Sequence, residues 1–156
     1  MNINIALLTV TDTRTFDNDK SGKILVDKIK KANHNLIDRK ICKDNKQDIV
    51  LILNEWIKKK DIDVVITTGG TGLTGRDITP EALDEIADKQ IPGFGEIFRT
   101  ISLKTVGTSS IQSRACAVLA KGKYIFALPG SSGGVTDAWE EILKHLLDIN
   151  HKPCNF

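Results

Sequence analysis

Residue types that mark secreted, metal-binding or membrane proteins are scarce in this sequence. Its three cysteines (Cys42, Cys116 and Cys154) are odd in number and lack CxxC spacing, which argues against a disulfide scaffold and against a zinc site. No apolar run approaches the length of roughly 20 residues that a membrane-spanning helix needs. The first residues also lack the basic and apolar regions of a signal peptide, so we expect a cytoplasmic protein with no membrane partner.

An excess of charge of one sign is also missing. The formal net charge is +2 and aromatic residues make up 5% of the chain, so composition gives no case for binding nucleic acid. The three histidines (His34, His145 and His151) show no metal-ligand spacing, and no Ser-His-Asp or Cys-His order favours covalent catalysis. With 156 residues, 40% of them hydrophobic, we expect one globular domain over residues 1–156.

Short apolar runs alternate with segments of helical periodicity along the chain. Strands are expected at residues 3–10, 35–42 and 64–66, and a hairpin over 115–128 that turns at Lys121-Gly122. Helices are expected at residues 21–32 with Ser21 as N-cap, from after 45 to about 60, from 80 to about 88 with Thr79 as cap, around 94–101, and at 135–147. Three β-helix units in succession predict an α/β fold, a three-layer αβα arrangement whose mostly parallel sheet contains one antiparallel strand.

The most informative segment is DVVITTGGTGLTGRDITPE at residues 63–81. A buried strand runs directly into four glycines within seven residues, and Pro80 stands where the first turn of a helix accepts proline. Glycines let several backbone N–H groups approach one anion without interference from Cβ atoms. A plain strand-to-helix connection is shorter and seldom contains four glycines, so we expect this loop to bind a phosphate or another anion.

Acidic side chains follow the strands of the predicted sheet, at the edge where ligands bind in such folds. Asp12 follows the first strand, Asp44 the second, and Asp77 the glycine loop, while a second glycine-rich loop begins at residue 129. A phosphate beside carboxylates needs a bridging cation, and Asp44 and Asp77 suit Mg²⁺, while Arg76 would neutralise a transferring phosphoryl group. A structural interpretation stays open: Asp77 caps the nearby helix and Asp44 starts a turn.

Two nucleotide-binding motifs can be tested against the glycine loop. It is not a Walker A loop, because Arg76-Asp77 follow Gly75 where Lys and Ser/Thr are required. Residues 70–75 match GxGxxG, but the motif follows the third strand and the helix begins only at Pro80. A nicotinamide-dependent oxidoreductase therefore stays as the weaker alternative.

Residues 67–72 (TTGGTG), continuing through 76–82 (RDITPEA), resemble the signature of the MoaB/MogA family of molybdenum-cofactor biosynthesis proteins. Further matches are PGFGE at 92–96, SR at 113–114, LPG at 128–130 and KPCNF at 152–156. The tail, the GTS segment at 107–109 and the LPGSS loop are more similar to the MoaB branch than to MogA. Together these matches span nearly the whole chain in order.

The resemblance implies a molybdopterin-binding-like fold and a molybdopterin adenylyltransferase, which uses ATP and Mg²⁺ and assembles as a trimer or hexamer. Asp44 and Asp77 match two aspartates that the family needs for adenylyl transfer, so the resemblance implies that they are catalytic and hold Mg²⁺. A pterin-binding protein without catalysis is the alternative. The candidate substrate-binding residues are Asp12, Thr68, Gly69, Gly70, Thr71, Gly72, Arg76, Thr79, Pro80, Ser102, Ser113, Pro129, Gly130 and Ser131.

Overall fold

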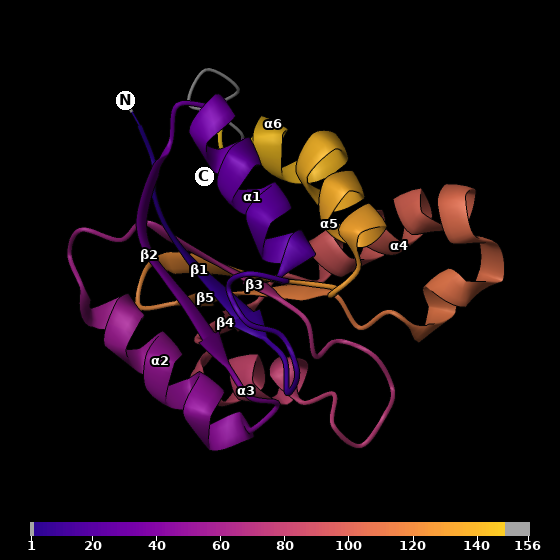
Figure 1. Cartoon of the computed structure of the whole chain (residues 1–156), viewed down its shortest axis with the longest axis horizontal. Coiled ribbons are helices and arrows are strands. Elements are labelled where there is room, and N and C mark those ends of the chain that lie inside the picture. The colour runs from indigo at the N-terminus through magenta and orange to yellow at the C-terminus, as the bar shows by residue number, and fades with distance from the viewer. Residues whose placement is uncertain (1, 149–156) are drawn as a thin grey trace.

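A twisted six-stranded sheet forms the centre of the computed structural model, which describes residues 2–148 (Figure 1). The strands are β1 (Asn4–Val10), β2 (Asn35–Cys42), β3 (Val64–Thr68), β4 (Lys89–Gln90), β5 (Cys116–Ala120) and β6 (Lys123–Leu128). Their order across the sheet is β2-β1-β3-β6-β5-β4. Four strands (β2, β1, β3 and β6) pair in parallel, and β5 runs antiparallel to both of its neighbours. The predicted α/β fold with one antiparallel strand is confirmed.

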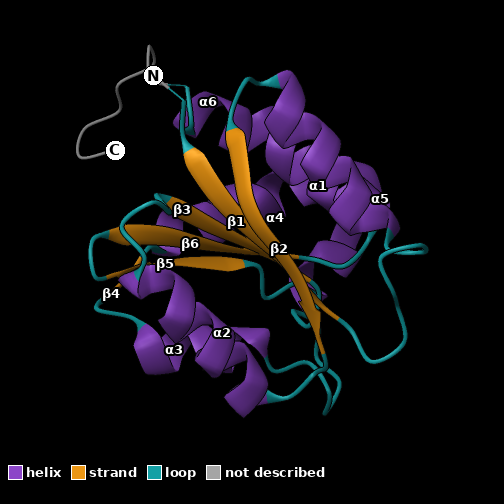
Figure 2. Cartoon of the chain, turned by 60° about the vertical axis from the view of Figure 1, so that its left-hand side comes forward, coloured by secondary structure: helices purple, strands orange, loops and turns teal. Residues whose placement is uncertain are grey.

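Helices cover both faces of this sheet (Figure 2). The helical segments are α1 (Lys20–Lys31), α2 (Lys46–Lys58), α3 (Thr79–Ile86), α4 (Pro92–Val106), the 3₁₀ turn η1 (Gly107–Gln112), α5 (Ser132–Ala138), the π-helical turn η2 (Trp139–Leu143) and α6 (Lys144–Leu146). One core lies between the sheet and α1, α4 and α5, and it includes Leu25 and Phe98. The other lies beneath α2 and α3, and it includes Trp56 and Leu83. Alternating side chains along β1 serve both cores, as strand geometry requires.

The starts of two helices differ from the prediction. Helix α1 is capped by Asp19, whose side chain accepts a hydrogen bond from the Gly22 N–H, and Ser21 lies inside the first turn. Helix α3 begins at Thr79 after Ile78, without a side-chain cap. The Thr79 hydroxyl instead donates to the carbonyl of Gly69, 2.9 Å away. Tertiary contacts therefore decide which of the neighbouring polar residues serves as a cap.

Several other boundaries also differ. The short helix expected around 94–101 is the 15-residue helix α4, because Pro92 starts the helix at a position that tolerates its missing N–H. Strand β4 was not predicted, since two residues carry no periodic signal. The helix expected at 135–147 contains the π-helical turn η2. The tail at 152–156, which contains Cys154, lies outside the described residues, and so does His151. Within residues 2–148, no helix combines the length and apolarity needed to cross a membrane.

Candidate active site

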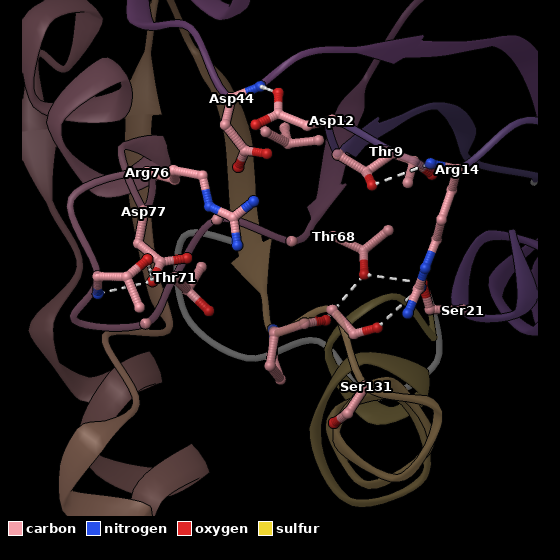
Figure 3. A pocket seen from close by; sticks show the side chains of 18 of the residues that line it. Thr9, Asp12, Arg14, Ser21, Asp44, Thr68, Thr71, Arg76, Asp77 and Ser131 are labelled. Carbon is pink, nitrogen blue, oxygen red and sulfur yellow. Dashed lines mark hydrogen bonds between the residues drawn. The ribbon is translucent and has the colours of Figure 1, made fainter.

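The carboxyl ends of β1, β2, β3 and β6 border a pocket of about 580 Å³ (Figure 3). The parallel pairing explains this placement, because it brings the loops that follow these strands to one edge of the sheet. Thirteen of the sixteen candidate residues line the pocket: Asp12, Asp44, Thr68, Gly69, Gly70, Thr71, Gly72, Arg76, Asp77, Ser113, Pro129, Gly130 and Ser131. The two aspartates and the glycine loop therefore share one cavity.

The other three candidates do not line this pocket. Thr79 and Pro80 are buried in the first turn of α3. Thr79 supports the glycine loop from behind, since its backbone N–H donates to the carbonyl of Gly70, 3.0 Å away. Ser102 is buried on α4, where its carbonyl accepts a hydrogen bond from the Thr105 hydroxyl. Direct contact between Ser102 and a ligand in the pocket has no support in this arrangement.

Backbone geometry explains why the first glycines of the loop are required. Gly69 has φ +102°, and a Cβ atom there would lie 2.2 Å from the carbonyl oxygen of Val10. Gly70 has φ +71°, and its Cβ would lie 2.3 Å from the Thr79 hydroxyl oxygen. Both residues occupy the left-handed region that disfavours other side chains. The absence of Cβ atoms lets the loop fold tightly over the ends of β1 and β3.

Asp77 is held by a set of hydrogen-bond donors from its own loop. The backbone N–H and the hydroxyl of Thr74 donate to its carboxylate at 2.9 and 2.8 Å, and the Gly72 N–H also bonds to it. Burial opposes ionisation, but these hydrogen bonds and the nearby charge of Arg114 outweigh it and lower the pKa of Asp77. Asp77 does not cap α3, so the structural interpretation of this residue is wrong.

The pKa of Asp44 is shifted in the opposite direction from that of Asp77. Its pKa is raised by burial and by the negative charges of Asp12 and Asp77, with Arg76 acting in the other direction. Asp12 also accepts a hydrogen bond from the Asp44 N–H at 3.0 Å, and the Arg76 side chain projects toward the centre of the pocket (Figure 3). Three carboxylates thus face one another with a single arginine among them, a charge distribution that favours a bound cation.

The donor set fits Mg²⁺ better than a metal held by protein side chains alone. Among residues 2–148, no group of three or more His, Cys, Asp or Glu side chains is arranged to hold a metal ion. Mg²⁺ commonly takes only one or two carboxylates, with phosphate oxygens and water completing its octahedron. Asp44 and Asp77 match that pattern if the ligand supplies phosphate.

Polar residues that the sequence analysis missed line the other half of the pocket (Figure 3). Arg14 donates to the carbonyl of Gly130 at 3.2 Å and contacts the Ser21 hydroxyl at 3.4 Å. Thr68, which the sequence analysis did select, lies in the same half of the pocket and donates to the carbonyl of Pro129 at 2.8 Å. Arg14 follows β1 by four residues, so the strand-end argument that selected Asp12 could have selected it too.

Fold and pocket together define an α/β protein with a polar pocket, lined by a glycine loop and three aspartates, at the carboxyl edge of its sheet. Helix α3 begins well after the last glycine of the loop, which does not match a dinucleotide-binding domain. The chain belongs to the MoaB/MogA family of molybdenum-cofactor biosynthesis proteins: the family model described as "Probable molybdopterin binding domain" matches residues 6–148. The resemblance noted in the sequence is confirmed.

Relatives in this family are similar over nearly their whole length. Molybdenum cofactor biosynthesis protein B of Escherichia coli (strain K12) is 45% identical over 152 residues, covering 97% of this chain and 89% of that protein. A crystal structure of molybdenum cofactor biosynthesis protein B superposes with a TM-score of 0.90 at 39% identity, covering 98% of both chains. The tungsten cofactor synthesizing protein MoaB from Pyrococcus furiosus gives 0.84 at 35% identity, covering 96% of this chain and 95% of that one.

Proposed function

We propose that this protein adenylylates molybdopterin with ATP, giving adenylyl-molybdopterin and pyrophosphate. An oxygen of the molybdopterin phosphate attacks the α-phosphorus of ATP, and the bond from that phosphorus to the oxygen bridging the β-phosphate breaks. Because the nucleophile is already an anion, positioning and charge stabilisation supply most of the rate. One observation carries the proposal: the glycine loop and the carboxylates of Asp44 and Asp77 line the same pocket.

Each group of pocket residues has a role that follows from its chemistry. The loop at 69–72 binds the molybdopterin end of the substrate pair through the backbone N–H groups of Gly70 and Thr71, because those of Gly69 and Gly72 donate to the Leu128 carbonyl and the Asp77 carboxylate. Arg76 offsets charge on the transferred phosphoryl group. Asp44 and Asp77 hold Mg²⁺, which when bound neutralises the polyphosphate and orients its oxygens. Asp12 fixes the backbone of Asp44 through the hydrogen bond that it accepts from the Asp44 N–H.

The test is incubation of the purified protein with α-labelled ATP, Mg²⁺ and molybdopterin, followed by measurement of adenylyl-molybdopterin and pyrophosphate. We expect Asp77→Asn to lower the rate by at least about 100-fold, as loss of a charged transition-state contact does, while molybdopterin binding is retained. Asp61→Asn, an exposed carboxylate in the turn before β3, is the matched control and should keep full activity. Molybdopterin binding without pyrophosphate release would instead identify a non-catalytic binding protein.

We propose further that the protein forms a homo-oligomer, a trimer or hexamer, as members of this family do. Four large apolar side chains on α4 and η1 support this proposal because each is more than half exposed. They are Ile97 (54%), Leu103 (51%), Val106 (55%) and Ile111 (81%). Such a group on one helix and the turn that follows it is typical of an interface.

A further inference from the structure

Arg114 immediately precedes Ala115 and β5, and it makes an unusual set of contacts with the glycine loop. It does not line the candidate active site but borders a neighbouring cavity of about 610 Å³. Its backbone N–H donates to the carbonyl of Thr71, its Nε to that of Gly72, and its Nη2 to that of Asp77, each at 2.8 Å. One residue therefore holds three carbonyl groups of the loop that carries Asp77.

These contacts fix the direction of the N–H groups as well as of the carbonyls. In a planar trans peptide the N–H points opposite to the C=O of the same unit. The carbonyls of Thr71 and Gly72 point toward Arg114. The N–H groups in the same two peptide units, those of Gly72 and Leu73, therefore point away from it. The Gly72 N–H bonds to the Asp77 carboxylate, which is the group aimed into the pocket.

The guanidinium is itself held in place from α3. Its Nη1 forms an ion pair with Glu81, in the first turn of that helix. All three nitrogens of the guanidinium are therefore engaged, in a planar fork that matches several acceptors at once. A lysine would bring one charge to the same position but could not reach two separated carbonyls and Glu81 together.

We propose that Arg114 is a positioning residue, which holds the loop at 71–77 in the conformation that presents the Asp77 carboxylate to the ligand. It acts from behind the loop and touches neither substrate. The catalytic consequence rests on the proposed adenylyl transfer, whereas the effect on loop conformation does not. Lys123 supplies a control, because its ammonium also donates to two carbonyls, those of Lys59 and Ile62, at the amino ends of the parallel strands, opposite the pocket.

The first readout is amide hydrogen exchange in the protein without ligand. Arg114→Gln should speed exchange at residues 72–78 by roughly 10-fold or more, because the two side-chain anchors, to the carbonyls of Gly72 and Asp77, are lost together. Arg114→Lys should behave like Arg114→Gln, since the geometry of the fork matters more than the charge. Lys123→Gln should leave exchange in this loop within about 2-fold of the original protein while lowering thermal stability to a similar extent.

The second readout is steady-state kinetics of adenylyl transfer. Arg114→Gln and Arg114→Lys should lower kcat by about 10-fold or more, since a small misplacement of a catalytic group is sufficient for such a loss. The KM for ATP should change less than kcat, and Lys123→Gln should leave both constants unchanged. If the original protein shows no transfer but the exchange effect appears, the proposed reaction fails and the positioning role stands.

The proposal is overturned if folded Arg114→Gln shows unchanged exchange at 72–78 and unchanged kcat. It is also overturned if Arg114→Lys retains both properties of the original protein, because charge alone would then suffice. Should the Arg114 variants fail to fold, Glu81→Gln leaves the arginine in place and removes its charged partner. That variant should raise exchange in the same loop by a smaller factor, and exchange at the original rate would contradict the role.

Discussion

Asp44 and Asp77 lie in one pocket, yet their surroundings stabilise opposite charge states. Asp77 is surrounded by hydrogen-bond donors that favour its carboxylate, so its pKa is lowered despite burial. Asp44 is half-buried, and this partial burial and the nearby charges of Asp12 and Asp77 raise its pKa. A cation bound between them would relieve the repulsion at Asp44 most. The free protein accordingly holds Asp44 at a cost in stability, a pattern common at functional sites.

Substitution of Asp44 should separate stability from activity. At pH 7 and without Mg²⁺, Asp44→Asn removes one of three neighbouring negative charges, so its thermal midpoint should equal or exceed that of the original protein. Added Mg²⁺ with ATP should raise the midpoint of the original protein more than that of the variant, and adenylyl transfer should fall at least about 100-fold. Differential scanning calorimetry with and without Mg²⁺ and ATP measures these thermal midpoints. A lower midpoint for the ligand-free variant would contradict the claim that repulsion from Asp12 and Asp77 destabilises the protein at Asp44.

Asp19 is a structural carboxylate with a clear pH dependence. It is fully buried, caps α1, and accepts hydrogen bonds from the Thr9 hydroxyl at 2.6 Å and from Arg39 at 3.1 Å. Burial opposes its charge, but hydrogen bonds from Thr9, Gly22 and Arg39 prevail and lower its pKa from 3.8. A carboxyl with a lowered folded pKa stabilises the fold above its unfolded pKa, and that stabilisation is lost as pH falls through the folded pKa.

Asp19→Asn should therefore destabilise the protein by about 2 kcal/mol at pH 7, since a hydrogen-bonded charge pair with Arg39 is lost. The difference in free energy of unfolding between the variant and the original protein should narrow as the pH falls below about 4. There the original protein begins to lose the stabilisation that its ionised Asp19 provides. Urea denaturation at a series of pH values measures the loss of stability at pH 7 and its change with pH. Asp17→Asn, an exposed carboxylate in the same loop, is the control, and an equal loss there would refute the explanation.

At the scale of elements, two glycines of the same loop offer a sharp comparison. Gly69 has φ +102° and its Cβ would lie 2.2 Å from a backbone oxygen, whereas a Cβ at Gly75 meets nothing within 4 Å. Gly69→Ala should destabilise by about 2 kcal/mol or more, because both strain and a backbone clash are introduced. Gly75→Ala should change the free energy of unfolding by less than about 1 kcal/mol. Denaturant unfolding of the two variants compares them directly.

Element types were predictable from the sequence, whereas helix starts were less so. The apolar run at 64–66 and the helical stripe containing Trp56 carry strong signals, and the structure places them in β3 (Val64–Thr68) and α2 (Lys46–Lys58). The cap of α1 was predicted to be Ser21 but is Asp19. Asp and Ser are both good capping residues, and the two lie within one turn of each other, so local preference could not distinguish them. The choice depends on Arg39, which approaches Asp19 from β2 and carries no local signal.

At the scale of the whole molecule, the strand order explains how much of the site could be predicted. Loops that follow parallel strands meet at one edge whatever the details of packing, so Asp12, Asp44 and Asp77 could be grouped from sequence. Arg114 could not be assigned its contacts, because it reaches the glycine loop from the segment before an antiparallel strand. Ser102 was a candidate that no motif supported, and helix α4 buries it outside the pocket.

Assembly is the remaining property at this scale, and the exposed apolar side chains on α4 and η1 provide the test. Ile111 is 81% exposed, and burying it against another copy would stabilise the assembly by roughly 2 kcal/mol. We expect sedimentation equilibrium to give a trimer or hexamer for the original protein and a smaller species for Ile111→Glu, because a buried unpaired charge opposes association. Leu51→Glu is the matched control, since Leu51 is 70% exposed on α2, across the sheet. A monomer at all concentrations in the original protein would contradict the proposed assembly, and dissociation by Leu51→Glu alone would move the interface to the α2 face.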